Sequence, residues 1–291
     1  MVKDLIAKPI SEKIYKQIVT CIEENQAVLK LKMMIVGEDP ASTFYVNNIK
    51  NNCRKLGIEV DTETLPVDVS QDELLNHINE ANQDPSVTGI MVQKPLPKHI
   101  CSNSVAAAID PYKDVDGFNP KNLGELMIEI KSLRPSTAQA VREFIRYYEI
   151  ELAGKHTVLC GRSNIVGKPL ASMLIGKREP GNATLTVCHS KTGDISRFTK
   201  QADILITALG QPRFITADMI KEGVIIIDVG TNEVEENGKR KYVGDVDFEG
   251  CYEKAKAITP VPGGVGSVTT ATLLRNIMKA YKMQNGLFDE I

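Results

Sequence analysis

The chain has 291 residues, with 35 basic and 37 acidic side chains and a formal net charge of −2 at pH 7. This length suits one large domain or two medium ones, and the near balance of charge argues against nucleic acid as a partner. No apolar run approaches the ~20 residues that cross a bilayer, and the N-terminus lacks a signal-peptide pattern. We therefore expect a cytoplasmic protein without a membrane partner.

The six cysteines are scattered and form no C-x-x-C pair. This usage is typical of reduced thiols in a cytosolic protein. Because the chain has four scattered histidines, we expect no metal site.

The first half of the chain alternates helical and strand patterns. Pro9 suits the first turn of a helix, and apolar spacing predicts that helix over Ile10–Ile22. The elements predicted next are a strand over Leu29–Val36, a loop over Gly37–Pro40, a helix from Ser42 or Thr43 to Leu56, a strand over Ile58–Leu65, a helix over Gln71–Asn82 after Ser70, and a strand over Gly89–Val92. This order is typical of an open parallel sheet, which binds ligands where its strands end, here at Gln93.

The second half repeats the alternation after a polar loop over Lys113–Pro120 and a helix over Ser136–Glu151. A strand from Thr157 ends at Gly161, and a polar turn then leads into a helix over Lys168–Ile175. Such a turn leaves free backbone N–H groups for a dinucleotide pyrophosphate, although the spacing is not G-x-G-x-x-G and an ordinary β-α turn is the alternative. The remaining predictions are strands over Ala183–Cys188, Ala202–Thr207, Val224–Val229 and Ala257–Thr259, and a helix over Thr269–Met283.

Several further segments are specific in their order and spacing. They are Asp39–Val46, Val92–Pro97, Lys113–Phe118, Gly161–Gly167, Cys188–Thr192, Ile227–Gly230, Val243–Val246 and Ile258–Gly266. Together they resemble the methylenetetrahydrofolate dehydrogenase/methenyltetrahydrofolate cyclohydrolase family over essentially the whole chain. The run Pro260–Gly266 is the most specific of them.

The resemblance implies an α/β fold with two domains. Residues 1–135 would form an N-terminal α/β catalytic domain, completed by a C-terminal helix over 267–291 that packs back on it. Residues 136–266 would form a Rossmann-type NAD(P)-binding domain. The resemblance also implies a homodimer and a tetrahydrofolate substrate. Its activity would be oxidation of 5,10-methylenetetrahydrofolate to 5,10-methenyltetrahydrofolate, with hydrolysis to 10-formyltetrahydrofolate as the family's second activity.

By the same resemblance, Tyr45 packs against the folate ring system, Gln93 supports the reacting centre and Asp116 hydrogen-bonds the pterin. A flat heteroaromatic ligand needs an aromatic face and a few fixed polar partners, which these side chains supply. Glycines let the backbone approach a ligand where a side chain would prevent it, although a plain turn is the alternative. The loop residues expected at the folate on this ground are Pro262, Gly263 and Gly264.

Gly161, Arg162 and Ser163 resemble the cofactor-contacting turn of the family. Arg162 and Ser190 are expected to grip an adenosine 2′-phosphate, because a planar and permanently charged guanidinium suits that dianion. No acidic residue ends the strand Ala183–Cys188, where an NAD enzyme would often have one. We therefore expect NADP rather than NAD.

The lysine that is central to hydrolysis in the family is absent from this chain. Bifunctional members carry Tyr-x-x-x-Lys on the second helix, whereas here Tyr45 is followed by Ile49 and then Lys50. At ~100° per residue, Ile49 lies ~40° and Lys50 ~140° from Tyr45 around the helix, unless a bulge intervenes. Because isoleucine cannot transfer a proton, we expect the dehydrogenase to persist and the cyclohydrolase to be weak or lost.

Two smaller departures concern other positions. Thr231 stands where the family more often has isoleucine, and its backbone is still expected to meet the nicotinamide. In Arg134–Ala140 the chain lacks the family's second proline and its glycine, and the sequence gives no functional reason for this.

Three alternatives remain open from the sequence. The first is an NAD-linked member that has the dehydrogenase activity alone, and the second is a folate- or nucleotide-binding protein without turnover. The third, an unrelated Rossmann dehydrogenase of the shikimate type, fits the domain order but not the loop Pro260–Gly264.

Overall fold

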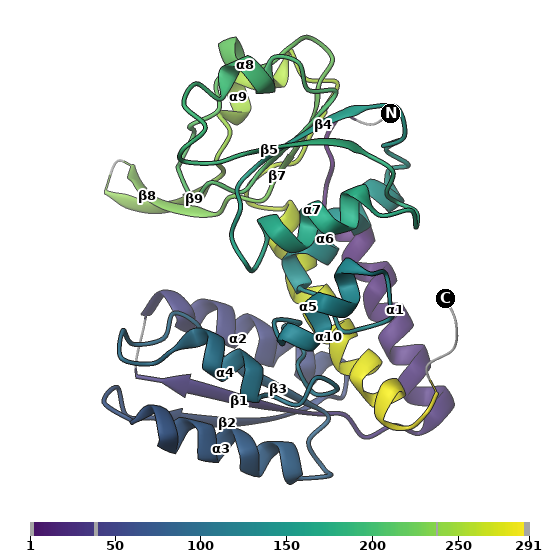
Figure 1. Ribbon diagram of the computed structural model, residues 1–291, viewed down its shortest axis with the longest axis vertical. Helices are drawn as coiled ribbons and strands as arrows, with labels where there is room; N and C mark the ends of the chain where they lie inside the picture. Colours follow the sequence, from purple (N-terminus) through teal and green to yellow (C-terminus); the bar gives the residue numbers. More distant parts are fainter. Residues whose placement is uncertain (1–2, 38–39, 237, 288–291) are drawn as a thin grey trace. The chain divides into compact units, whose positions relative to one another are not determined.

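The structure, a computed structural model, describes residues 3–37, 40–236 and 238–287 (Figure 1). The chain divides into two compact units, each built on a parallel sheet. The three-stranded unit comprises Lys13–Ser136 and Thr270–Ile291, and the five-stranded unit comprises Met1–Glu12 and Thr137–Thr269. The expected two-part α/β fold with parallel sheets is confirmed. Within the described ranges, no helix is long and apolar enough to cross a bilayer.

In the three-stranded unit the central strand is β1, with β2 and β3 parallel to it on either side. The elements before the polar loop are α1 (Lys8–Asn25), β1 (Lys30–Val36), α2 (Pro40–Lys55), β2 (Glu59–Leu65), α3 (Gln71–Gln83) and β3 (Gly89–Val92). Ser70 caps α3, which follows it as expected, because its hydroxyl accepts a hydrogen bond of 3.2 Å from the Glu73 amide. Residues 38 and 39 of the loop expected over Gly37–Pro40 lie outside the described residues.

The polar loop after β3 is not a solvated turn but an extension of the sheet. The Ile90 amide donates to the Lys113 carbonyl at 2.7 Å, and Ile90 pairs with Asp114 in a parallel bridge. Lys113 is 7% exposed, and its ammonium caps the end of α3 by donating to the carbonyls of Ala81 (3.2 Å), Asn82 (2.8 Å) and Asp84 (2.7 Å). The segment is therefore anchored to both β3 and α3.

Helix boundaries differ from the expectation at several points. Two helices follow where none was predicted, α4 (Ser102–Ala108) and α5 (Pro120–Met127). Asn119 and Pro120 look like turn formers in the sequence, but here they start α5, because the Asn119 side chain accepts from the Lys121 amide at 2.8 Å. The later helices are α6 (Ser136–Tyr147), which ends before the predicted Glu151, and α10 (Val265–Gln284), which begins before the predicted Thr269.

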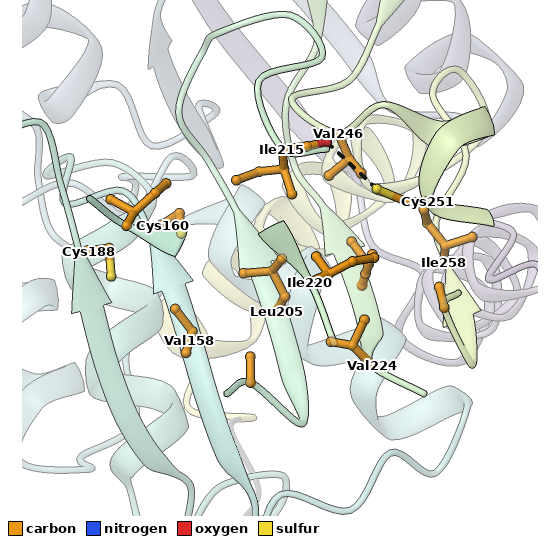
Figure 2. Packing of buried hydrophobic residues seen from close by; sticks show 14 residues of the cluster. Val158, Cys160, Cys188, Leu205, Ile215, Ile220, Val224, Val246, Cys251 and Ile258 are labelled. Atoms are coloured by element: carbon orange, nitrogen blue, oxygen red, sulfur yellow. Dashed lines mark hydrogen bonds between the residues drawn. The ribbon is translucent and has the colours of Figure 1, made fainter. Parts of the chain in front are cut away.

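In the five-stranded unit the strand order is β10-β7-β6-β4-β5, and every neighbouring pair is parallel. The strands and helices are β4 (His156–Cys160), α7 (Gly167–Ile175), β5 (Thr184–Cys188), α8 (Ser196–Thr199), β6 (Ile204–Thr207), β7 (Ile225–Asp228), α9 (Phe248–Tyr252) and β10 (Ala257–Ile258). Figure 2 shows apolar side chains of these strands, among them Val158, Leu205 and Ile258, packed into one buried cluster. Since all five strands are parallel, the loops that follow them share one edge of the sheet.

An antiparallel hairpin that the sequence patterns did not predict lies outside this sheet. Its strands are β8 (Asn232–Glu236) and β9 (Lys239–Val243), and it projects from the unit in Figure 1. Charged residues predominate in both strands, so neither carries the apolar run that marks a buried strand.

Two buried aspartates hold the loops at the carboxyl edge of the five-stranded sheet. Asp228, the last residue of β7, accepts from the Thr207 hydroxyl at 2.9 Å and from the amides of Gly230 (2.9 Å), Asp245 (3.2 Å) and Val246 (2.9 Å). Asp245 is fully buried and accepts from the amides of Leu209 (2.5 Å), Gly210 (3.2 Å) and Gln211 (2.9 Å) and from the Asn232 side chain (3.0 Å). These carboxylates replace the acceptors that a neighbouring strand would supply.

We predict that Asp228→Asn destabilises the protein by ~2–4 kcal/mol at neutral pH, because an amide NH₂ group would face backbone donors. Burial raises the pKa of Asp228 from 3.8 to about 6. The folded protein therefore takes up this proton before the unfolded chain does, and this carboxyl contributes more stability as pH falls from about 6 towards 4. The variant's deficit in unfolding free energy, measured by urea denaturation, should be ~1 kcal/mol larger near pH 5 than near pH 7.

The matched control is Glu235→Gln, which changes an exposed carboxyl of the same unit. It should alter the unfolding free energy by less than ~0.5 kcal/mol at either pH. A deficit of Asp228→Asn that stays constant between the two pH values would contradict the assigned direction of the shift.

Candidate active site

Three predicted site residues of the three-stranded unit lie together near the carboxyl end of β3. Gln93 directly follows β3, and Asp116 lies on the segment that extends the sheet beside it. Continuing the register of the Ile90–Asp114 bridge places Asp116 level with Val92. Tyr45 lies on α2, and its pKa is raised by burial and by the nearby Asp116 carboxylate. The structure thus brings an aromatic ring, an amide and a carboxyl to one place.

The Asp116 carboxyl changes its protonation state near neutral pH. Burial and the neighbouring Asp114 carboxylate raise its pKa from 3.8 to about 7, while the positive charge of Lys94 opposes this shift. The backbone turn after Asp116 depends on Gly117, whose φ is 75° and whose missing Cβ would lie 2.3 Å from the Arg134 carbonyl carbon. Only glycine fits there, so the direction of this turn is fixed.

Gln93 presents a buried acceptor without a partner. The residue is 8% exposed, its backbone amide donates to the Met34 carbonyl at 2.8 Å, and its Nε2 donates to the Lys94 carbonyl at 2.6 Å. No donor among the described residues reaches Oε1. Leaving a buried acceptor unsatisfied costs ~1–3 kcal/mol, and such an atom indicates where a donor of a ligand belongs.

An aliphatic side chain occupies the helix position one turn after Tyr45. Ile49 is fully buried on α2, which is a regular α-helix from Pro40 to Lys55, so no bulge turns Lys50 towards Tyr45. The amine expected of the family is therefore absent from this helix face.

Lys94 was not among the predicted site residues. Its Nζ lies 4.1 Å from the centroid of the Phe118 ring, two residues beyond Asp116. The available signal was its position next to Gln93, but its relation to Phe118 and Asp116 arises from the bridge between β3 and the loop, which local patterns do not reveal.

In the five-stranded unit, the turns after β4 and β5 lie side by side. Cys160 and Cys188 are register partners at the ends of these parallel strands, as Figure 2 shows. The Gly161 amide donates to the Cys188 carbonyl at 2.9 Å. The predicted cofactor residues that follow these strand ends are Arg162, Ser163 and Ser190, and all three are exposed. A permanently charged guanidinium and hydroxyl groups therefore occupy neighbouring turns at one corner of the sheet, a donor set that fits a phosphate group.

The expectation that the start of α7 leaves its backbone amides free is wrong for its first residues. The Ser163 hydroxyl accepts from the amides of Val166 (3.1 Å) and Gly167 (3.4 Å), and the Ser163 carbonyl accepts from the Lys168 amide (3.0 Å). A serine in the turn acts as an internal cap for the helix, and this removes those donors from an incoming anion.

The remaining predicted residues follow β7 and β10 at the same carboxyl edge. Thr231 is exposed between β7 and β8, and Pro262 and Gly263 are exposed in the loop after β10. Gly264 is buried, and a Cβ there would lie 2.3 Å from the Pro260 carbonyl oxygen. The turn itself therefore requires glycine at 264, which favours the plain-turn interpretation over ligand approach at that residue.

Family models match nearly the whole chain. The model for the tetrahydrofolate dehydrogenase/cyclohydrolase catalytic domain matches residues 3–116, and the model for the NAD(P)-binding domain of the same family matches residues 135–285. The "Bifunctional protein FolD" of Chloroherpeton thalassium is 50% identical over 287 residues, which span 96% of this chain and 98% of that protein.

Solved structures agree with these matches. The bifunctional FolD methylenetetrahydrofolate dehydrogenase/cyclohydrolase of Campylobacter jejuni is 43% identical with a TM-score of 0.90, covering 96% of this chain and 98% of that one. The FolD enzyme of Trypanosoma brucei, solved with NADP cofactor and an inhibitor, is 33% identical with a TM-score of 0.89, covering 98% and 99%. The resemblance inferred from the sequence motifs is confirmed, and the chain belongs to the tetrahydrofolate dehydrogenase/cyclohydrolase family.

Proposed function

We propose that this protein oxidises 5,10-methylenetetrahydrofolate to 5,10-methenyltetrahydrofolate with NADP in one-carbon folate metabolism. The observation that carries the proposal is the cluster of Tyr45, Gln93 and Asp116 at the end of β3 in a chain of this family. When bound, the nicotinamide supplies the hydride acceptor. Hydride transfer depends mainly on alignment of the two reacting carbons, and it needs no general acid at position 49.

Each residue of the cluster has a role that its surroundings support. Tyr45 offers an aromatic face to the pterin and aminobenzoyl rings, and burial keeps its phenol protonated. The Oε1 atom of Gln93 would accept from the ligand near the reacting carbon, which would remove its unsatisfied state. Asp116 would accept from the N–H donors of the pterin. Pro262, Gly263 and Gly264 remain proposed folate contacts on the strength of the family motif alone.

For the cofactor we propose NADP, held by Gly161, Arg162 and Ser163 with Ser190 on the next turn and Thr231 near the nicotinamide. The support is the pairing of β4 with β5, which places the Arg162 and Ser190 turns side by side. The Trypanosoma brucei relative was solved with NADP. The sequence after β5 reads Cys188-His189-Ser190-Lys191, with no carboxylate to repel a 2′-phosphate.

The family resemblance also supports a cytoplasmic homodimer. It supports a catalytic domain over 1–135 with 267–291 and a nucleotide domain over 136–266, and these assignments stay predictions.

We predict that Arg162→Ala raises KM for NADP ~10–100-fold and leaves KM for NAD within about twofold. One or two charge-assisted hydrogen bonds to the 2′-phosphate, which NAD lacks, would be lost. Steady-state rates of cofactor reduction with each nucleotide measure this. The control is Arg240→Ala, which changes an exposed arginine of β9. Equal losses with both nucleotides, or a wild-type preference for NAD, would favour the NAD-linked alternative.

The second family activity, hydrolysis of the methenyl product, we propose to be weak or lost. Attack of water on the methenyl carbon must release a proton, and Ile49 can neither accept one nor orient the water. We predict that Ile49→Lys accelerates single-turnover hydrolysis of methenyltetrahydrofolate by ~100-fold, the lower end of general acid–base assistance.

Ile49→Met is the matched control, since it keeps an apolar side chain of similar size and adds no amine. It should leave both hydrolysis and cofactor reduction near their wild-type rates. Wild-type hydrolysis as fast as that of bifunctional relatives would refute the proposed loss. Tight folate binding without any cofactor reduction would instead favour the non-catalytic alternative.

A further inference from the structure

We propose that Lys94 is a positioning residue for folate, whose ammonium acts as the counter-ion that keeps Asp116 in the form that accepts hydrogen bonds from the pterin. The inference rests on the proposed function, because it takes the pterin as the partner of Asp116. The inference assigns a role to Lys94, which was not among the predicted site residues and which the hydride transfer itself does not require.

The position of Lys94 is fixed at three points. Its carbonyl accepts from the Gln93 side chain at 2.6 Å, its backbone follows the end of β3, and its Nζ lies 4.1 Å from the centroid of the Phe118 ring. A lysine over an aromatic face gains ~0.5–2 kcal/mol, depending on its desolvation. Phe118 lies two residues after Asp116, so the ring holds the ammonium at the turn that carries this carboxyl.

A counter-ion is needed here because two carboxyl groups are crowded into one turn. Asp114 is 1% exposed and accepts from the amides of Gly117 (3.0 Å) and Asn119 (2.7 Å) and from the Asn122 side chain (3.0 Å). Burial raises the pKa of Asp114, and these hydrogen bonds, together with the charge of Lys94, oppose that rise. When Asp114 is ionised, its negative charge opposes ionisation of Asp116 two residues away.

The groups that face Asp116 come from three elements. Asp114 lies on its own segment, Lys94 follows β3, and Tyr45 lies on α2. Tyr45 stays neutral around pH 7 because its pKa is raised, so Asp114 and Lys94 supply the opposing charges. With Lys94 in place the pKa of Asp116 is about 7, and without it the carboxyl would hold its proton to higher pH.

The protonation state decides whether the pterin is recognised. The pyrimidine edge of a pterin carries a ring N–H and an amino group, and both are donors. A carboxylate accepts from both, whereas a carboxylic acid turns a donor of its own towards one of them. Folate affinity should therefore fall as pH decreases through the pKa of Asp116.

The test is the pH dependence of binding of 5-formyltetrahydrofolate, a stable reduced folate, measured by titration calorimetry on the full chain. In Lys94→Met the midpoint of the affinity loss should move upward by ~1 unit, so that Kd near pH 7 rises ~3–10-fold. Well above both midpoints the variant and the wild type should bind equally. Lys94→Arg, which keeps the charge, should restore the wild-type midpoint.

Lys98→Met is the control, because it removes an exposed lysine of the same segment and also reports any titration of the ligand itself. An unmoved midpoint in Lys94→Met would overturn the inference. So would a loss of affinity that is equal at every pH, since that is what a packing role alone produces. If the wild type binds no reduced folate at any pH, both the proposed function and this inference are wrong. If it binds folate equally well at every pH, only this inference is wrong.

Discussion

The two parallel sheets of this protein end in loops whose buried backbone amides need acceptors that no neighbouring strand supplies. Buried aspartates supply the missing acceptors: Asp114 in the three-stranded unit, and Asp228 and Asp245 in the five-stranded unit. A buried backbone donor without a partner costs about as much as a lost hydrogen bond. The positions of the loops at the carboxyl edges of both parallel sheets therefore depend on these buried carboxylates.

This constraint has an electrostatic consequence that differs between the two units. Asp228 and Asp245 are surrounded by backbone donors and by hydroxyl or amide groups. Their hydrogen bonds therefore hold the loops in place. Asp114 also holds a loop by hydrogen bonds, but it lies two residues from the half-buried Asp116. A carboxyl group that stabilises the loop therefore lies close to one that is proposed to bind the ligand. Burial raises the pKa of Asp116 to about 7, and the nearby Asp114 carboxyl adds to that rise.

How far the sequence predicted this structure can be argued from particular segments. β3 and β6 are short apolar runs, and they were predicted because burial on both faces leaves a local signature. The start of α5 at Asn119-Pro120 was missed, since the same residues favour a turn and a helix cap, and tertiary contacts decide between them. The hairpin of β8 and β9 was missed because its strands are rich in charged residues and lack an apolar run, although the pair Asn237-Gly238 between them is a hairpin-turn signal in the sequence. Tyr45, Gln93 and Asp116 were found through family motifs, whereas Lys94 acquires its neighbours only when the loop pairs with β3.

Ile49 stands where the family has a lysine, and this difference bears on two reactions with different requirements, hydride transfer and hydrolysis. Hydride transfer requires two carbon atoms to be held in line. In the proposed function the fixed turn at Gly117 and the hydrogen-bonded amide of Gln93 would meet that requirement without any proton transfer. Water chemistry requires a group that changes its protonation state beside the reacting carbon. In this chain Ile49 is buried where such a group would be, and no donor from the described residues reaches Gln93 Oε1. The positive charge near the cluster comes instead from Lys94, after β3, where it acts on Asp116 rather than on the face of Tyr45. In the proposed function these charges would hold and orient a folate, whereas α2 carries the aliphatic Ile49, and not an amine, one turn after Tyr45.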